Sequence, residues 1–301
     1  MRSLCVCLAA TWLVAAPPGL VAAELKPATL AAFHRYVTVT EARMANEVSG
    51  SSPFLWIDRQ PAGARKQIDA TLAAGRVVVE HLETRETGKS IDIPDGLVHH
   101  WVGTVFLPGV PLDRAIQFVQ DYDGYPRAFG PMVQSARVNA HDGDRFRVAM
   151  RTSMHKVITV VIDAEYVIDY QSLGSSRVWT KSIATHVREV SNAGGPNESS
   201  KPAEQGGGFM WRLNTYCSFD ARPTGTYEQC ESISLSRGLP FGIGWMVSPF
   251  VTAVPREALE FTLGHVRENL LASESRFLEP VVPDAPVVPV VRSLFARPSD
   301  F

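Results

Sequence analysis

The chain has 301 residues, enough for one large domain or two small ones. Apolar residues make up 45% of it, charged residues only 20%, and the formal net charge is −2. A hydrophobic core is therefore easily supplied, but no excess of positive charge exists to attract nucleic acid or an anionic membrane. We expect no nucleic-acid partner, and transient contact with a membrane surface stays open.

The first 23 residues have the features of a secretory signal peptide. Arg2 supplies a positive start, an apolar segment follows over residues 4–16, and small residues at 21–23 suit cleavage before Glu24. The alternative is an uncleaved anchor, which needs about 20 continuous apolar residues. The Pro-Pro-Gly at residues 17–19 interrupts this run, and no later stretch is long enough. We expect a secreted or periplasmic protein whose mature chain has no transmembrane segment.

Two cysteines remain after removal of the signal peptide, because Cys5 and Cys7 lie within it. The remaining pair, Cys217 and Cys230, flanks a turn-like stretch at residues 222–225. A hairpin centred on this turn places the two cysteines opposite each other. An oxidising compartment then favours a disulfide, with two buried free thiols as the alternative.

Residues 24–90 are predicted to form an N-terminal extension. Apolar residues at helical spacing predict an amphipathic helix over 27–48, which must dock on another part of the molecule. A second short helix is expected over 63–74, and a β-rich run over 77–84.

Strand patterns dominate the main body. A strand is expected over residues 97–107 and a helix over 112–123. Apolar and polar residues then alternate over 146–150 and 158–168, and a long strand follows over 177–190. Such alternation predicts an antiparallel sheet with one buried face.

The C-terminal part of this body is expected to hold a hairpin and a helix. Strands over residues 209–219 and 226–237 carry the two cysteines. A helix with an apolar stripe is expected to begin near Pro255, since proline is favourable in a first helical turn. Residues 276–301 are rich in Val and Pro and are expected to form a disordered, polyproline-type tail.

This order of elements resembles the START-like superfamily, also called SRPBCC, which includes polyketide cyclases, lipid-transfer proteins and pollen allergens. The stretches that carry the resemblance are His-Trp-Val-Gly-Thr-Val at 100–105, Asp-Tyr-Asp-Gly-Tyr-Pro at 121–126, Pro-Met-Val at 131–133 and Gly-Asp-Arg-Phe at 143–146. The resemblance implies an α+β helix-grip fold over residues 91–275, with a curved antiparallel sheet wrapped around a long C-terminal helix. The helical N-terminal extension is a departure from it. It also implies a cavity for a small apolar ligand such as a lipid, quinone or polyketide.

Strand pairing suggests which side chains line this cavity. If Ile233 and Leu235 face inward, the cysteine register brings Arg212 and Asn214 to the same face and Glu231 beside Tyr216. Buried polar groups need partners, since an unpaired one costs about 1–3 kcal/mol, and a ligand's polar head could supply them. A one-residue slip would instead turn them to solvent. The predicted ligand-binding residues are Arg212, Asn214, Tyr216, Glu231, Ile233, Leu235, Tyr166, Met150, Phe146 and Ile162, with Val148, Ile158 and Val160 completing the apolar wall.

No motif for catalysis or cofactor binding is found in the sequence. The histidines lack metal-ligand spacing, and there is neither a phosphate-binding loop nor a nucleophile elbow. We expect no cofactor and no metal. General acid–base work by Arg212, Tyr216, Glu231 or Tyr166 stays open beside a purely structural network of the same residues.

Three functions are therefore compared. The first is an exported carrier for a hydrophobic, lipid-like ligand. The second is an enzyme of the cyclase, aromatase or hydratase type acting on an apolar substrate. The third is an interaction module whose N-terminal extension fills the cavity.

Overall fold

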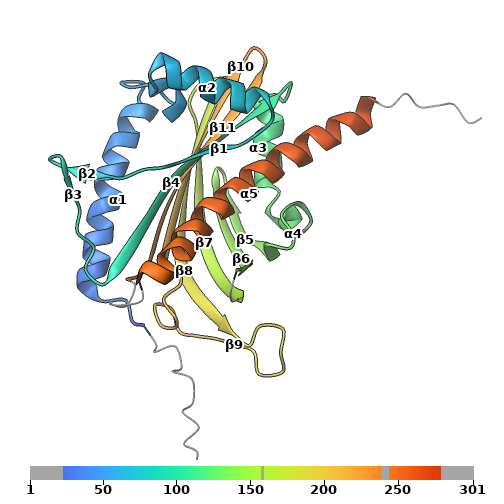
Figure 1. Cartoon of the computed structure of the whole chain (residues 1–301). Helices are drawn as coiled ribbons and strands as arrows, with labels where there is room; N and C mark the ends of the chain where they lie inside the picture. Colours follow the sequence, from blue (N-terminus) through green and yellow to red (C-terminus); the bar gives the residue numbers. More distant parts are fainter. Residues whose placement is uncertain (1–22, 157–158, 239–243, 279–301) are drawn as a thin grey trace, which may run out of the picture.

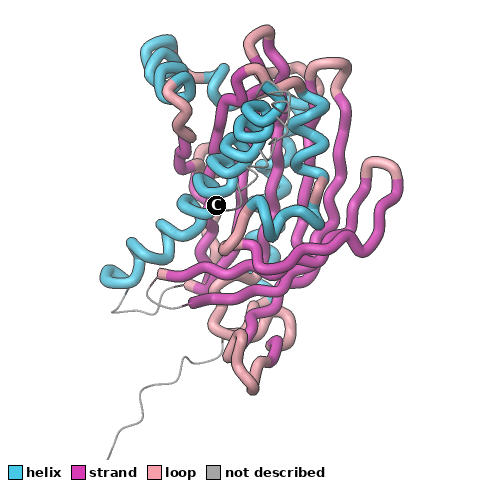
Figure 2. The backbone as a smooth tube through the Cα atoms, turned by 90° about the vertical axis from the view of Figure 1, so that its right-hand side faces the viewer, coloured by secondary structure: helices cyan, strands magenta, loops and turns pink. Residues whose placement is uncertain are grey.

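The computed structural model describes residues 23–156, 159–238 and 244–278, with side chains of the C-terminal helix described over 253–272. The expected signal peptide with Cys5 and Cys7, Ile158, and residues 279–301 of the expected tail lie outside the described residues. One curved antiparallel sheet lies between two long helices, α1 (Pro27–Val48) and α5 (Gly244–Leu278) (Figures 1 and 2). We name the two sides of this sheet the α1 face and the α5 face.

The strand order places the cysteine hairpin in the middle of the sheet. The N-terminal extension supplies β1, which pairs with β4 at one edge, and the short β9 (Ser199–Ser200) pairs with β8. In spatial order the strands are β1 (Val78–His81), β4 (Gly96–Pro108), β11 (Gly225–Arg237), β10 (Arg212–Arg222), β8 (Arg177–Ser191), β7 (Thr159–Ser172), β6 (Arg145–His155) and β5 (Val133–Asp142).

Smaller elements surround the sheet. The remaining helices and strands are the 3-10 helix η1 (Trp56–Arg59), α2 (Ala62–Ala73), the two-stranded pair β2 (Arg85–Glu86) and β3 (Lys89–Ser90), α3 (Leu112–Gln120), the 3-10 helix η2 (Tyr122–Gly124) and α4 (Tyr125–Ala128). Both α3 and α4 contact α5, so they lie on the α5 face. The expected α+β helix-grip architecture is confirmed.

Two elements differ from the sequence-based expectation. The C-terminal helix begins at Gly244, not near Pro255. The sequence pattern favours Pro255 in the first turn because proline lacks a backbone donor, but the helix continues through it. Strand β5 was not predicted. Most of its residues are exposed, so no apolar alternation marks it.

The cysteine hairpin forms as expected. Cys217 pairs with Cys230 in the β10–β11 register, and the two form a disulfide. The predicted disulfide is therefore confirmed, and free thiols are excluded for this structure.

Helix α1 covers one face of the sheet with a buried apolar core. Phe33, Tyr36 and Met44 of α1 pack with strand residues of β10 and β11, among them Ile233 and Leu235. This face is opposite the one covered by α5. The third function compared above required the extension to fill the space between sheet and C-terminal helix. Helix α1 does not fill that space, because its apolar residues pack against the opposite face of the sheet.

Helix α5 approaches the sheet most closely at Gly103 of β4. Its buried stripe consists of Leu259, Leu263, Val266 and Leu270. A Cβ atom at Gly103 would lie 2.6 Å from Cδ1 of Leu263 and 3.0 Å from Cγ of Leu259. Only a glycine at this position lets the helix lie directly on β4.

We predict that Gly103→Ala destabilises the protein. The added methyl group would push the buried Leu263 and Leu259 away from β4, and such overpacking typically costs about 1–3 kcal/mol in free energy of unfolding. Urea unfolding measures this loss. Gly63→Ala is the matched control, because no atom lies within 4 Å of a Cβ there and alanine suits helix α2. Equal stability of the two variants would contradict the close approach.

Candidate functional site

The predicted ligand-binding residues lie on two different faces of the sheet. Residues paired directly across strands share a face, and the β10–β11 register pairs Arg212 with Leu235, Asn214 with Ile233 and Tyr216 with Glu231. The predicted pairing is therefore correct. However, the face these residues share is covered by α1. The expectation that they line the space beneath the C-terminal helix was wrong.

Four other predicted residues do lie on the α5 face. Phe146 is part of the core beneath α5, and Met150 and Tyr166 pack against it. Ile162 lies on the same side of β7, in a small cluster at the end of the sheet with Ala164, and Val160 packs against that cluster. Alternation along a strand fixes which residues share a face, but it does not say which helix will cover that face. The predicted set therefore forms no single site.

Glu231 is the centre of a buried polar network on the α1 face. Its Oε1 lies 2.6 Å from Nε2 of His100, whose Nδ1 lies 2.9 Å from the Tyr36 hydroxyl. Arg43 of α1 forms ion pairs with both Glu231 and Glu47. Burial alone would raise the pKa of Glu231, but the His100 hydrogen bond and the charges of His100 and Arg43 outweigh it and lower this pKa. Glu231 is thus an ionised carboxylate whose Oε1 is paired with His100 and Arg43.

The other predicted polar residues also have partners within the protein. The Tyr216 hydroxyl donates to Oε1 of Glu41 at 2.7 Å and accepts from Nδ2 of Asn214 at 3.1 Å. Arg212 forms an ion pair with Glu204 and donates to the Trp211 carbonyl oxygen at 2.7 Å. No ligand is needed to satisfy these groups. The network joins α1 to the sheet.

A row of uncharged polar residues crosses the α5 face. Ser232 of β11 pairs with Trp101 of β4 on one side and Thr215 of β10 on the other. Thr215 in turn pairs with Ser182 of β8. Ser234 of β11 lies on the same face, two residues from Ser232. We name Ser182, Thr215, Ser232 and Ser234 the hydroxyl row.

The α5 face is incompletely covered at the middle of β10 and β11. On the two central strands β10 and β11, Thr215 and Ser232 of the α5 face are half-buried, whereas Asn214, Tyr216 and Ile233 of the α1 face are buried. Among the described residues, the four side chains of the hydroxyl row have no hydrogen-bond partner. Unpaired hydroxyl groups with accessible surface in the middle of a sheet are suited to contact a bound molecule.

Tyr166 of β7 is deeply placed but not completely covered. Removal of water by burial raises the pKa of its hydroxyl to about 12, yet the side chain is half-buried by accessible surface. In the described part of the chain its hydroxyl has no hydrogen-bond partner. Tyr166 thus packs on the core of the α5 face with some accessible surface left.

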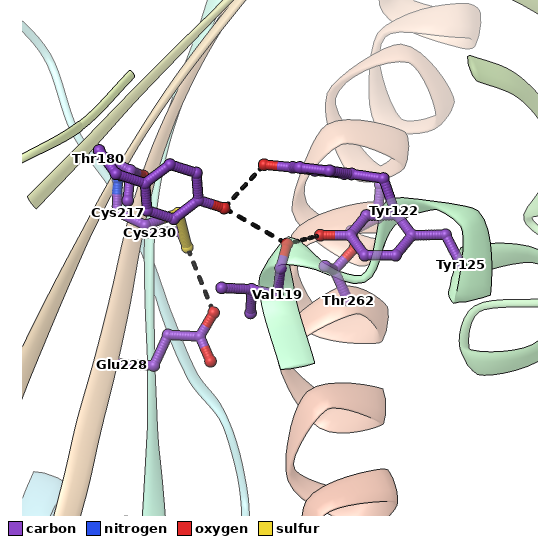
Figure 3. Close-up of a disulfide and its surroundings, with 10 residues drawn as sticks. Val119, Tyr122, Tyr125, Thr180, Cys217, Glu228, Cys230 and Thr262 are labelled. Carbon is purple, nitrogen blue, oxygen red and sulfur yellow. Dashed lines mark hydrogen bonds between the residues drawn. A yellow bond between two sulfur atoms is a disulfide. The ribbon is translucent and has the colours of Figure 1, made fainter. Parts of the chain in front are cut away.

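Glu228 is an unpaired carboxyl group on the α5 face, which the sequence analysis missed. Only 3% of the residue is exposed, and its Oε2 has no hydrogen-bond partner within the described residues. Its Oε1 lies 3.8 Å from Sγ of Cys230 (Figure 3). A disulfide sulfur carries no hydrogen to donate, so only a protonated Glu228 can supply a proton to this contact. Burial raises the pKa of Glu228 to about 8, which keeps it neutral at pH 7.

Three tyrosines and a histidine are further polar side chains on this side of the sheet. The Tyr122 and Tyr170 hydroxyls are hydrogen-bonded at 2.7 Å, and the Tyr125 hydroxyl donates to the Val119 carbonyl oxygen at 2.8 Å (Figure 3). His99 of β4 lies 2.9 Å from the Ser236 hydroxyl, and burial lowers its pKa to about 4. The ionisable groups here are thus neutral near pH 7.

The order of elements decides the fold class. A strand and helices lead into a run of antiparallel strands, and the curved sheet then holds a long C-terminal helix against one face. The chain has the helix-grip architecture of START-like proteins.

Several solved structures are similar to this START-like chain. A STAR-related lipid transfer protein from Xanthomonas axonopodis is 13% identical, with a TM-score of 0.42 over 64% of this chain and 98% of that one. The Zhui aromatase/cyclase from a Streptomyces species is 12% identical, with a TM-score of 0.36 over 60% and 96% of the two chains. A START superfamily protein from Mycobacterium smegmatis is 11% identical, with a TM-score of 0.36 over 59% and 98%. This similarity concerns the fold alone.

No family model matches the sequence, and no curated protein matches it. Within the described residues, no group of three His, Cys, Asp or Glu side chains is placed to hold a metal ion. No described helix is long and apolar enough to cross a bilayer.

A surface recess of about 820 Å³ lies at the end of the START-like sheet near the start of α3. Leu112 and Ile116 of α3 and Arg222 and Thr226 of the β10–β11 hairpin line part of it. None of the predicted ligand-binding residues contributes to this recess.

We predict that Glu228→Gln removes a pH dependence of stability. The folded protein keeps the Glu228 proton up to about pH 8, whereas the unfolded chain releases it near pH 4.5. Between these values the free energy of unfolding falls as the pH rises, by roughly 1.4 kcal/mol per pH unit for this group. Glutamine stays neutral, so the variant should gain stability relative to wild type as the pH rises. Urea unfolding at several pH values measures the difference.

Glu231→Gln is the control with the opposite sign. Since the pKa of Glu231 is lowered, its contribution to stability is present above pH 4.5 and lost as the pH falls below that value. Removing its charge breaks the ion pair with Arg43, so this variant should be less stable than wild type at neutral pH. The loss should be smaller than the roughly 3–5 kcal/mol of a fully buried pair, because Arg43 is partly exposed and keeps Glu47 as a partner. A Glu228→Gln curve parallel to wild type would show that Glu228 is ionised in the folded protein.

Proposed function

We propose that this START-like domain binds an apolar, lipid-like molecule between the α5 face of the sheet and helix α5. The observation that carries the proposal is Tyr166, which is remote from bulk water but keeps accessible surface and an unpaired hydroxyl. The half-buried members of the hydroxyl row border the same side of the sheet. These hydroxyl groups lack hydrogen-bond partners among the described residues, so a bound molecule could supply them.

The proposed ligand site keeps part of the predicted set. Tyr166, Met150 and Phe146 supply apolar contact on the sheet side, and Ile162 extends it toward the end of β7. Leu259 supplies contact from α5. Affinity would come chiefly from burial of the ligand's apolar surface, at about 25 cal/mol per Å² before the costs of ordering are subtracted. Of the six predicted residues on the α1 face, Tyr216, Glu231, Ile233 and Leu235 instead contact α1.

We expect Ser232→Phe to displace the ligand. A phenyl ring at the centre of the α5 face would occupy the space beside Thr215 and Trp101. Solvent extraction of the purified protein followed by mass spectrometry should recover an apolar molecule from wild type and several-fold less from the variant. Thr185→Phe is the control, because Thr185 is exposed on β8. A wild-type protein that is repeatedly empty would refute the proposal.

A second candidate function is an enzyme that acts on an apolar substrate at the same place. Glu228 favours it, because a neutral buried carboxyl group with a pKa of about 8 is suited to general acid–base chemistry. Glu231, the earlier candidate base, is held as an ion pair and is not available. The same extraction distinguishes the two functions. A carrier yields the same molecule from wild type and Glu228→Gln, whereas an enzyme yields a different, unconverted molecule from the variant.

We also propose that the protein is exported and acts outside the cytoplasm, in a secreted or periplasmic location. The Cys217–Cys230 disulfide supports this, because such bonds persist in oxidising compartments. The expected signal peptide supports it independently. Mass spectrometry of the protein from the extracytoplasmic fraction of its host should find a chain that begins at Glu24 with both thiols oxidised. A chain that retains Met1 and reduced thiols in the cytoplasm would contradict export.

A further inference from the structure

The two faces of the sheet differ sharply in charge. In the described parts of β4, β6, β7, β8, β10 and β11, no Lys, Arg or Asp lies on the α5 face. The α1 face of the same strands carries ion pairs such as Arg177 with Asp220 and Arg151 with Asp163. Charge is thus concentrated on one side of a single sheet.

The few ionisable groups on the α5 face bring no charge to the space beneath α5. Glu228 and Tyr166 are protonated near pH 7 and His99 is not, since burial opposes ionisation of all three. Glu189, at the end of the sheet, accepts hydrogen bonds from the backbone nitrogens of Gly207 and Phe209. Two histidines are exposed at the edges of this face: His141 of β5 stacks on Phe146, and His81 of β1 contacts the Trp101 ring edge-on.

Over residues 253–272, where its side chains are described, the helix that covers this face adds no free cation. Arg256 pairs with Glu260, and Glu257 with Lys156 of the β6 end. Arg267 donates to the Phe106 carbonyl oxygen at the β4 side. In addition, the sequence from residue 238 to residue 255 contains no charged residue at all.

A carboxylate or phosphate buried here would therefore lack a partner. An unpaired buried charge is far more costly than an unpaired hydroxyl or carbonyl, and proteins that bind such anions supply Arg or Lys. The hydroxyl row offers a different kind of contact. Serine and threonine hydroxyls both donate and accept, so they suit a neutral polar group.

We propose that the ligand is an uncharged apolar molecule whose polar end, an ester, ketone or alcohol, lies against the hydroxyl row of Ser182, Thr215, Ser232 and Ser234. This inference rests on the proposed ligand site and narrows its chemistry. Free fatty acids and phospholipids with buried headgroups are the ligands that it excludes.

The test compares ligands that differ only in the charge of their polar end. Straight-chain carboxylic acids, their methyl esters and the corresponding primary alcohols, from decyl to octadecyl, are titrated into the delipidated full-length protein at pH 7. Native mass spectrometry counts the bound molecules, and tryptophan fluorescence follows binding, with Trp101 beside the hydroxyl row as a reporter. Esters and alcohols should bind at least about tenfold more tightly than the acid of equal length.

A charge introduced into the hydroxyl row should reverse this preference. Ser232→Lys places an ammonium group at the centre of the α5 face and should favour the acid over the ester. Thr185→Lys adds the same charge at an exposed position of β8 and should leave the wild-type preference unchanged. If Ser232→Lys does not fold, the wild-type comparison of acid with ester still decides the question.

The outcomes separate this inference from the proposed function. Wild-type protein that binds the acid as tightly as the ester overturns the neutral-ligand inference and leaves the proposed ligand site standing. Wild-type protein that binds none of the three series at any chain length refutes both. Tighter binding of esters and alcohols, reversed only by Ser232→Lys, supports both.

Discussion

A single sheet buried on both faces is the constraint on which the rest of this structure depends. Each central strand must supply one set of side chains to α1 and another to α5, because neighbouring residues point to opposite sides. The strands carry different kinds of side chain on the two faces. On the α1 face they offer ionised and hydrogen-bonding groups that are paired with the helix, and on the α5 face they offer apolar and hydroxyl groups.

The polar groups of the α1 face are paired with helix α1. Charged groups can be buried under α1 because His100 and Arg43 meet Glu231 within hydrogen-bonding reach, so no carboxylate there is left without a partner. This network and the core around Phe33 fix α1 to the sheet. Because α1 is committed there, it does not compete for the space beneath α5. The N-terminal extension is thus a support for the sheet.

The α5 face combines close packing with unsatisfied polar groups. At Gly103 the helix lies directly on β4, whereas Thr215 and Ser232 on the neighbouring strands remain half-buried. Glu228 and Tyr166 are protonated because burial opposes their ionisation. These properties of the α5 face are the basis of the proposed neutral, apolar ligand.

The sequence by itself predicted most of the strands and helices and the pairing of the two cysteines, because alternation, helical spacing and the cysteine register are local properties of the chain. The START-like fold class followed from the resemblance in the order of these elements. The sequence also determined that Arg212, Asn214, Ile233 and Leu235 share a face. Only the tertiary structure decided that α1 covers this face. It also decided that Glu228, which is three residues from Glu231 on β11 and therefore points to the opposite side, faces α5. The physical reason is that two amphipathic helices can each cover either side of a sheet. Which one does so depends on packing between segments far apart in the chain, and no periodicity within a strand records it.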